Sequence, residues 1–179
     1  MRPRLLTSIA LICFLFSPMP AQALLTPDNY RIIPLEPLFD RDVLVMGEPL
    51  KFSLRFRVEG VSSPDRDYEI RVALTDEYGH ERAAHAFFPT PPTSQWQPGA
   101  IVELPEQTIR VPPQIEPGAS TPITQPPIYE GLHHLLLSLR DAGSGDILDI
   151  SGDSPGGPDP FPNCPTLRDF WVTGAPAVI

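Results

Sequence analysis

The sequence predicts an all-β fold, an antiparallel β-sandwich of seven to nine short strands. Proline is the first reason, because 22 of the 25 prolines lie beyond residue 23. A helix interior rejects proline, since the residue has no N–H to donate and its ring clashes with the preceding turn. The second reason is a period of two in the apolar residues, interrupted by Gly, Pro, Asn and Asp. The turns are too short for crossover connections, which predicts antiparallel pairing with one polar face per strand.

The first element along the chain is a predicted secretory signal peptide, residues 1–23. Arg2 and Arg4 give it a positive start, residues 5–16 form an apolar run, and the tripeptide AQA ending at Ala23 has the small residues that a signal peptidase reads. A run of roughly a dozen apolar residues is short for a membrane span, which needs about 20. We therefore expect cleavage after Ala23, export to the periplasm or the extracellular space, and no stable membrane insertion of the mature chain.

Three long segments of the mature chain have the clearest strand pattern. In LKFSLRFRVEG, residues 50–60, large apolar residues alternate with polar ones, and YEIRVALTDEYG, residues 68–79, repeats the pattern before a turn at its end. GLHHLLLSLRDAGSGDILDI, residues 131–150, supplies a third long strand, a Gly-rich turn and a partner strand. A period of two places one face on a core and the other in water. The residues expected to face inward are Leu50, Phe52, Leu54, Phe56, Val58, Tyr68, Ile70, Val72 and Leu74. Shorter strands are predicted at Tyr30–Leu35, His80–Phe88, Ala100–Leu104, Gln107–Val111 and Leu167–Val172.

Residues 24–179 are expected to form a single domain, since about 156 residues are enough for one hydrophobic core. A Pro-rich loop insertion is predicted at about 112–130 and an irregular loop at about 151–166. Cys164 is the one cysteine after residue 23, so no disulfide can form within the mature chain. We expect this thiol to be inert in a packed loop; the alternative is pairing with another molecule.

The charge balance excludes partners that are recognised through anionic charge. The chain has 13 basic and 22 acidic side chains, a formal net charge of −9. Loss of Arg2 and Arg4 with the signal peptide makes the mature protein more acidic still. Such a chain does not seek nucleic acid or anionic lipid by charge alone, and we expect no nucleic-acid partner.

The histidines and acidic residues give no metal or cofactor signal. His133 and His134 are adjacent on a predicted strand, so their side chains point to opposite faces, and His80 and His85 have an unsuitable spacing for one site. The acidic Gly-rich segment of residues 141–159 lacks the ligand spacing of an EF-hand. We interpret its aspartates as solvated turn residues that keep sheet edges charged, with calcium binding as the alternative.

No catalytic motif stands out either. Ser154 lies in a glycine-rich loop, but the strand–turn–helix context of a nucleophile elbow is missing. Catalytic triads assemble in space rather than in sequence, yet a small β-sandwich with no candidate site is more often a binding or structural module. The prediction is a non-catalytic protein without a cofactor.

Two aromatic residues are the candidates for ligand contact. Trp96 stands just before a Pro-Gly turn at residues 98 and 99, where it could close one end of the sandwich or provide a stacking platform for a sugar ring. We favour packing, because tryptophans are more often mostly buried than displayed. Tyr129, at the end of the Pro-rich insertion, is the more exposed candidate.

The order of YEIRVALTDEYG, WQPGAIVE, IRVPPQIEPG and GLHHLLLSLRDAGSGDIL resembles the β-sandwich accessory region at the C-terminal ends of some bacterial membrane glycosyltransferases. The resemblance covers about residues 50–150 and rests on a W-x-P-G turn before a strand, a V-P that ends the next strand, and a Gly-led strand of alternating leucines. This chain departs from that pattern by an insertion at residues 119–130 and by lacking a membrane catalytic part, so no glycosyltransferase activity is implied.

What the resemblance implies is an immunoglobulin-like sandwich made as a free-standing exported protein. The expected function is a non-catalytic binding module of the cell envelope, whose partner is either a glycan or an envelope protein. The alternative is a structural or assembly subunit of an envelope or secretion complex, which would pair through exposed strand edges and Pro-rich loops.

Overall fold

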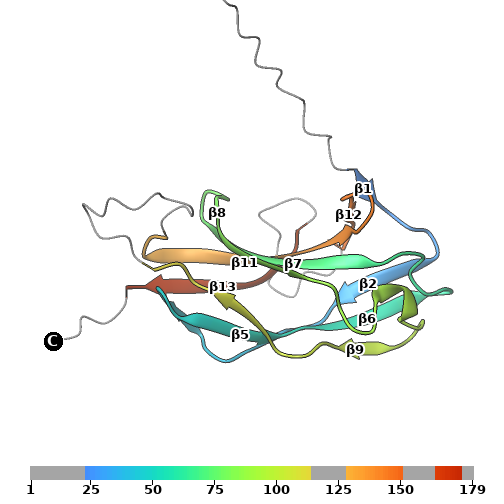
Figure 1. Ribbon diagram of the computed structural model, residues 1–179, viewed down its shortest axis with the longest axis horizontal. Helices are drawn as coiled ribbons and strands as arrows, with labels where there is room; N and C mark the ends of the chain where they lie inside the picture. The colour runs from blue at the N-terminus through green and yellow to red at the C-terminus, as the bar shows by residue number, and fades with distance from the viewer. Residues whose placement is uncertain (1–22, 114–127, 151–163, 175–179) are drawn as a thin grey trace, which may run out of the picture.

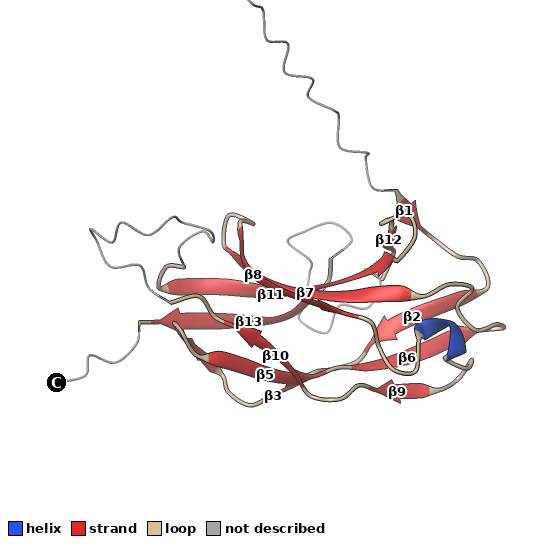
Figure 2. Cartoon of the chain, viewed as in Figure 1, coloured by secondary structure: helices blue, strands red, loops and turns tan. Residues whose placement is uncertain are grey.

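The computed structural model describes residues 23–113, 128–150 and 164–174. The predicted signal peptide up to residue 22, most of the Pro-rich insertion and most of the irregular loop lie outside the described residues. Ser154, Asp153 and Asp159 lie outside them as well. Within them the chain forms two β layers packed face to face (Figure 1), and the remaining element is a single 3-10 turn, η1 at Thr93–Gln95 (Figure 2).

The larger layer is one seven-stranded sheet built around β11. β7 pairs antiparallel with one edge of β11, and β13 and β12 pair antiparallel with the other edge. β8 extends the sheet beyond β7, while β4 and β1 add short parallel partners to β13 and β12. The strands of this layer are β1 (Leu24–Leu25), β4 (Val43–Val45), β7 (Tyr68–Asp76), β8 (Glu81–Phe87), β11 (Gly131–Asp141), β12 (Ile147–Leu148) and β13 (Thr166–Thr173).

The smaller layer consists of two three-stranded sheets joined end to end, β10-β5-β3 and β2-β6-β9. Leu54 alone separates β5 from β6, and the backbone hydrogen bonds continue across this break: the Leu54 carbonyl accepts from the Leu104 N–H and the Arg55 carbonyl from the Leu35 N–H, both at 2.9 Å. The strands are β2 (Tyr30–Pro34), β3 (Leu38–Phe39), β5 (Pro49–Ser53), β6 (Arg55–Gly60), β9 (Ile101–Glu103) and β10 (Gln107–Arg110).

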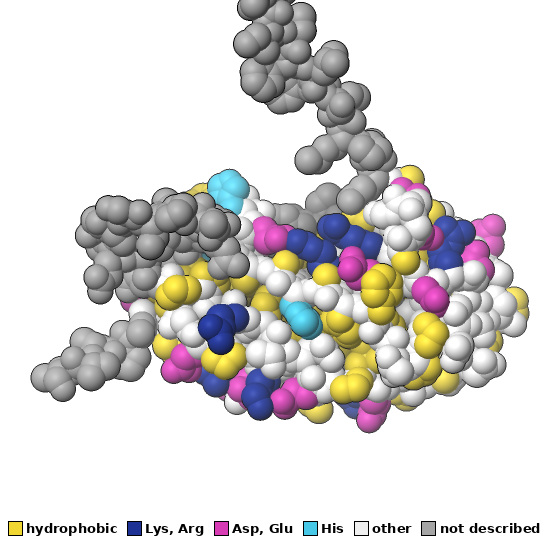
Figure 3. Space-filling view, in the orientation of Figure 1, with side chains coloured by type: hydrophobic (Ala, Val, Ile, Leu, Met, Phe, Trp, Pro, Cys, Tyr) yellow, Lys and Arg dark blue, Asp and Glu magenta, His cyan; other side chains and the backbone are white. Residues whose placement is uncertain are grey.

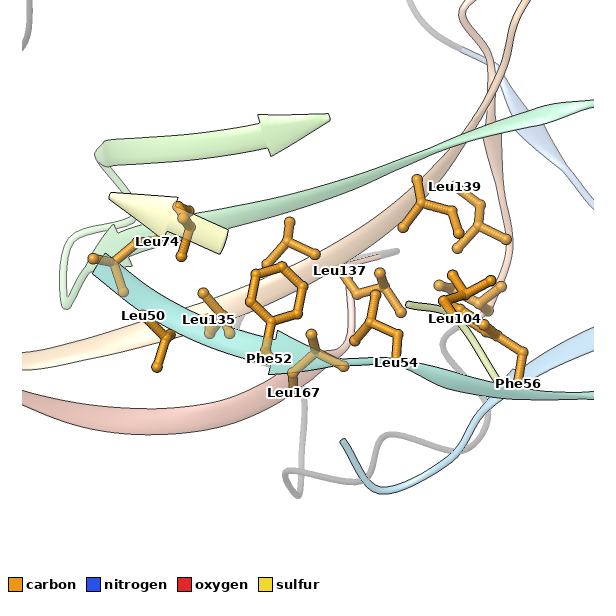
Figure 4. Close-up of a cluster of buried hydrophobic side chains, with 14 of the residues drawn as sticks. Leu50, Phe52, Leu54, Phe56, Leu74, Leu104, Leu135, Leu137, Leu139 and Leu167 are labelled. Atoms are coloured by element: carbon orange, nitrogen blue, oxygen red, sulfur yellow. The ribbon is translucent and has the colours of Figure 1, made fainter. Parts of the chain in front are cut away.

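The core lies between the layers, where the inward face of β5 and β6 meets the inward faces of β7 and β11 (Figure 4). All nine side chains expected to face inward are buried, as a period of two requires. From β11 the matching residues are Leu135, Leu137 and Leu139. The predicted fold class is confirmed as an all-β sandwich: two packed β layers whose long strands pair antiparallel.

The structure differs from the expectation at the sheet edges. β1, β3 and β4 were not predicted, and the pairs β1–β12 and β13–β4 are parallel. The chain crosses from the smaller layer at β3 to the larger layer at β4 and returns to the smaller layer at β5. Strands of two or three residues are too short to show an alternating pattern, so these crossings leave no signal in the sequence.

Candidate functional site

Trp96 lies in the core at one end of the sandwich. Its side chain is 1% exposed, its ring centroid lies 5.4 Å from that of Phe56, and its indole N–H donates to the Pro91 carbonyl at 3.0 Å. The following turn is fastened by the Gly99 N–H, which donates to the Val58 carbonyl at 2.8 Å. This is the placement that the packing interpretation expected, because a ring so deeply buried presents no face to a sugar.

Tyr129 lies at the opposite extreme, with 60% of its surface exposed. It directly follows the buried Ile128, and the Arg82 guanidinium stands 5.3 Å from the centroid of its ring. A cation over an aromatic face is an attractive arrangement. Tyr129 is therefore an exposed ring steadied from one side by a cation, and its role in ligand contact stays a prediction.

The Arg82 guanidinium is in turn held by Asp76, which ends β7. One oxygen of this carboxylate accepts from the backbone N–H groups of Tyr78 at 3.0 Å and His80 at 2.8 Å, and the other accepts from Arg82 Nε at 3.2 Å and from Arg82 Nη2. Burial alone would raise the pKa of the Asp76 carboxyl, but these hydrogen bonds outweigh it and lower the pKa to about 2. The group acts as the ionised centre of the turn.

His133 and His134 point to opposite faces of β11, as the sequence predicts. His133 is 2% exposed; its Nδ1 lies 3.2 Å from the Gly131 carbonyl, and burial lowers its pKa. His134 lies on the outer face of the sheet with its Nδ1 2.7 Å from a carboxylate oxygen of Asp169. The two imidazoles cannot share one ion.

The other two histidines are also separated by the fold. His80 contacts the Asp76 carboxylate at 3.3 Å in the turn, and His85 contacts the Gln107 side chain at 3.1 Å. Over residues 23–113, 128–150 and 164–174, no group of three or more His, Cys, Asp or Glu side chains is arranged to hold a metal ion. Cys164 is half-buried, and Pro165 separates it from β13.

Asp141, at the end of β11, organises its own turn. Its carboxylate accepts from the backbone N–H groups of Ser144 at 2.8 Å and Gly143 at 2.7 Å and from the Arg66 guanidinium at 2.8 Å. The Ser144 N–H makes the largest contribution to lowering the pKa of this carboxyl. The interpretation of this aspartate as a turn residue fits these contacts; calcium binding by the rest of the segment stays an open alternative.

A row of exposed apolar side chains crosses the outer face of the larger layer. Trp171 of β13 pairs with Val43 of β4 on one side and with Leu132 of β11 on the other. Their exposed fractions are 57% for Trp171, 45% for Val43 and 42% for Leu132. We call these three residues the apolar row. The sequence reasoning missed Trp171, which is the second tryptophan of the chain.

A polar pair accompanies the apolar row on the same face. His134 and Asp169 stand two positions along β11 and β13 from Leu132 and Trp171, and residues two apart on a strand share a face. The Asp169 side chain is 50% exposed. Exposed carboxylate oxygens therefore lie beside an exposed indole. Tyr129 precedes the same strand, β11, but the Arg82 guanidinium that contacts its ring belongs to the edge strand β8.

One hollow of about 420 Å³ lies where β2 begins and β12 ends. It is bordered by residues 26–28, 30–33 and 148–150. Tyr30 and Ile32 are buried beneath it, and its accessible border includes Asp28 and Arg31. The hollow joins the two layers at an edge, and of the residues that the sequence singled out it includes Asp149, from the acidic segment of residues 141–159.

Comparisons with known proteins leave the family open. No family model and no curated protein matches the sequence. Among solved structures, the chain is similar to the CARDB domain of a protein from Pyrococcus furiosus, described as a complex with di-metal ions. The two chains are 12% identical with a TM-score of 0.42, over 83% of this chain and 93% of that chain, and we draw no function from a likeness at this level. In the described part of the chain, no helix is long and apolar enough to span a membrane.

Proposed function

We propose that this protein is an exported, non-catalytic binding module of the cell envelope and that the apolar row belongs to its contact surface. The partner is an envelope glycan or an envelope protein. Export rests on the signal-peptide pattern of residues 1–23, and the envelope setting on the resemblance of residues 50–150 to an accessory region of glycan-building enzymes.

The observation that carries the proposal is the exposure of Trp171. Its indole is 57% exposed in the middle of a row that spans three paired strands. Aromatic side chains are enriched at binding surfaces because they combine a large apolar area with a polar edge. An indole displayed on rigid strands therefore supports a contact role.

The test is a binding survey with a matched control. The mature chain is applied to a glycan array and used for affinity capture from envelope extracts, alongside Trp171→Ala and Ile101→Ala. Ile101 is 60% exposed on β9 of the smaller layer, so its loss removes apolar surface from elsewhere on the molecule. We expect a partner that Trp171→Ala loses and Ile101→Ala keeps. An empty array together with an empty capture would argue strongly against the proposal.

The alternative, an assembly or structural subunit, is favoured by one strand. β8 has seven residues and, among the described residues, pairs only with β7. An edge strand of this length with unpaired backbone groups is a template for another strand. Sedimentation of the mature chain over a range of high concentrations tests this role, and a stable monomer without a co-purifying envelope protein would count heavily against it.

A further inference from the structure

We propose that the apolar row binds a neutral, hydroxyl-rich sugar chain, with one sugar ring stacked on Trp171 and its hydroxyl groups bonded to Asp169. This inference rests on the proposed function and names the ligand class of the same surface. It follows from three properties of the surface: its area, its geometry and its charge.

The area is too small for a stable protein interface. The exposed parts of the three side chains of the apolar row present on the order of 300 Å², whereas the apolar part of the surface that each partner buries in a standard protein complex is roughly 450 Å². A patch of this size lies within the range that an ordinary monomer displays. It suits a ligand that contacts the protein with one or two rings.

The geometry is that of a short strip. Val43, Trp171 and Leu132 occupy directly paired positions on neighbouring strands, and such strands lie about 4.8 Å apart. The strip is therefore about 10 Å long and runs across the strands. The C–H groups on one face of a pyranose ring are apolar and can pack against an indole, with weak C–H contacts to its π face.

The polar groups needed to recognise hydroxyls stand beside this strip. Asp169 is half-exposed, and its carboxylate contacts His134 Nδ1 at 2.7 Å. A carboxylate has about four acceptor sites, so oxygens of Asp169 can still accept from sugar hydroxyls. The imidazole fixes the carboxylate on the outer face of the sheet, and a positioned acceptor loses less entropy on binding.

The charge of the chain selects a neutral sugar over an acidic one. The formal net charge of the chain is −9, and one of the two polar groups paired beside the apolar row is the carboxylate of Asp169. An anionic polysaccharide would be repelled both by the overall field and by Asp169. A neutral sugar pays no such cost and still uses the carboxylate as an acceptor.

The two tryptophans make the test direct, because iodide can reach Trp171 at 57% exposure but not Trp96 at 1%. The mature chain is titrated with iodide in the presence of neutral oligomers of glucose, mannose, galactose, xylose and N-acetylglucosamine, and of an oligogalacturonate as the acidic counterpart. We expect at least one neutral oligomer to reduce iodide quenching about twofold or more and the acidic oligomer to have no effect.

Variants then assign the contact by calorimetry with the protecting oligomer. Trp171→Ala should abolish binding, Asp169→Asn should weaken it about tenfold because a neutral amide oxygen is a weaker acceptor than a carboxylate oxygen, and Ile101→Ala should leave it unchanged. Failure of every neutral oligomer at millimolar concentration overturns the inference. If Trp171-dependent capture of a protein accompanies that failure, the proposed binding function stands and only the ligand class is wrong; if nothing is captured, both fall.

Discussion

The two tryptophans of this chain occupy opposite environments, and the type of element that carries each residue does not by itself reveal which one is exposed. Trp96 precedes a Pro-Gly turn, a place where side chains are often displayed, yet it is 1% exposed. Trp171 stands between Phe170 and Val172 in an apolar stretch, yet it is 57% exposed. A turn can fold its aromatic back over the core, whereas a strand must send every second side chain outward. Position relative to the two layers decides exposure.

The surroundings of the two residues differ as much as their exposure. Near Trp96, the Thr93 hydroxyl accepts from the Tyr68 N–H at 2.8 Å and donates to the Arg66 carbonyl at 3.0 Å, and the hydroxyls of Tyr30 and Tyr68 lie 2.6 Å apart. The three residues of the apolar row, by contrast, are 42–57% exposed. Changes at the Trp96 end should therefore affect folding, and changes in the apolar row should affect binding.

The outer face of the smaller layer shows that an exposed face need not be apolar. Its strands present alternating charges joined in ion pairs, Lys51–Glu106 at 3.0 Å and Arg57–Glu59 at 2.9 Å. Figure 3 shows acidic and basic side chains side by side along the border formed by this layer. Charged pairs of this kind help to keep a sheet in solution, and the three side chains of the apolar row differ from them by being neighbouring, exposed and apolar.

Trp96→Ala should have the largest effect on stability. Emptying a buried aromatic site costs about 3–5 kcal/mol, a large part of the roughly 5–15 kcal/mol that a domain of this size has. Urea unfolding of the mature chain measures the loss, and expression should fall as well. An unchanged melting temperature would mean that Trp96 is not needed for packing, and Trp96 would then be the first candidate for ligand contact.

Gly60→Ala should be the next most damaging change. Gly60 has φ +119°, and an added Cβ would lie 2.4 Å from the Asn29 carbonyl oxygen and 2.7 Å from the Tyr30 Cα. Backbone atoms cannot rotate away, so strain and overpacking together should cost about 2–4 kcal/mol. The matched control is Gly99→Ala, where φ is +78° and no atom lies within 4 Å; only the left-handed strain of about 1 kcal/mol applies there. Equal losses of unfolding free energy in the two variants would show that the backbone at the β2–β6 junction moves to make room for the added Cβ.

Acid should weaken the Asp76 turn by a smaller amount. The pKa of Asp76 is about 2 in the folded chain against an ordinary 3.8, so its contribution is fully present above the ordinary pKa and is lost as the pH falls through the folded pKa. The difference is on the order of 2 kcal/mol. Urea unfolding between about pH 5 and pH 2 should show a shallower acid loss for Asp76→Asn than for the parent chain. Parallel pH profiles would contradict the assignment.

Much of this fold can be predicted from the alternation of apolar and polar residues. The strands that were not predicted are too short to show such an alternation. Along β5, β6 and β7 every second residue is large and apolar, so their inward faces were predictable residue by residue. Val43 lies on a strand of three residues, where no period can be recognised. The apolar row therefore combines β4, which the sequence does not predict, with β11 and β13, which it does.

The direction of the Trp171 side chain could not be predicted from the sequence for a related reason. Phe170, Trp171 and Val172 are all apolar, so the period of two cannot say which of them faces outward. Pairing settles it: Trp171 opposes the outward Leu132, while Phe170 opposes the buried His133. The exposure of Tyr129, by contrast, was predictable from its place beside a Pro-rich segment. Exposure alone does not identify a ligand, so the partner and the compartment stay predictions.

Trp171→Ala should have the smallest effect on stability and the largest on binding. The indole stands mostly in water on the outer face, and a surface substitution of this kind usually changes the free energy of unfolding by no more than about 0.5 kcal/mol. The variant should unfold at the urea concentration of the parent chain, remain at least as soluble, and lose the partner that the parent binds. Leu132→Ala, one strand away in the apolar row, should weaken the same binding less, because it removes a smaller contact and leaves the indole in place.

A loss of more than about 2 kcal/mol of unfolding free energy in Trp171→Ala would mean that the indole packs against another part of the protein. Trp171 would then join Trp96 as a structural residue, and Tyr129, steadied by Arg82 at the edge of the same layer, would become the first candidate for contact.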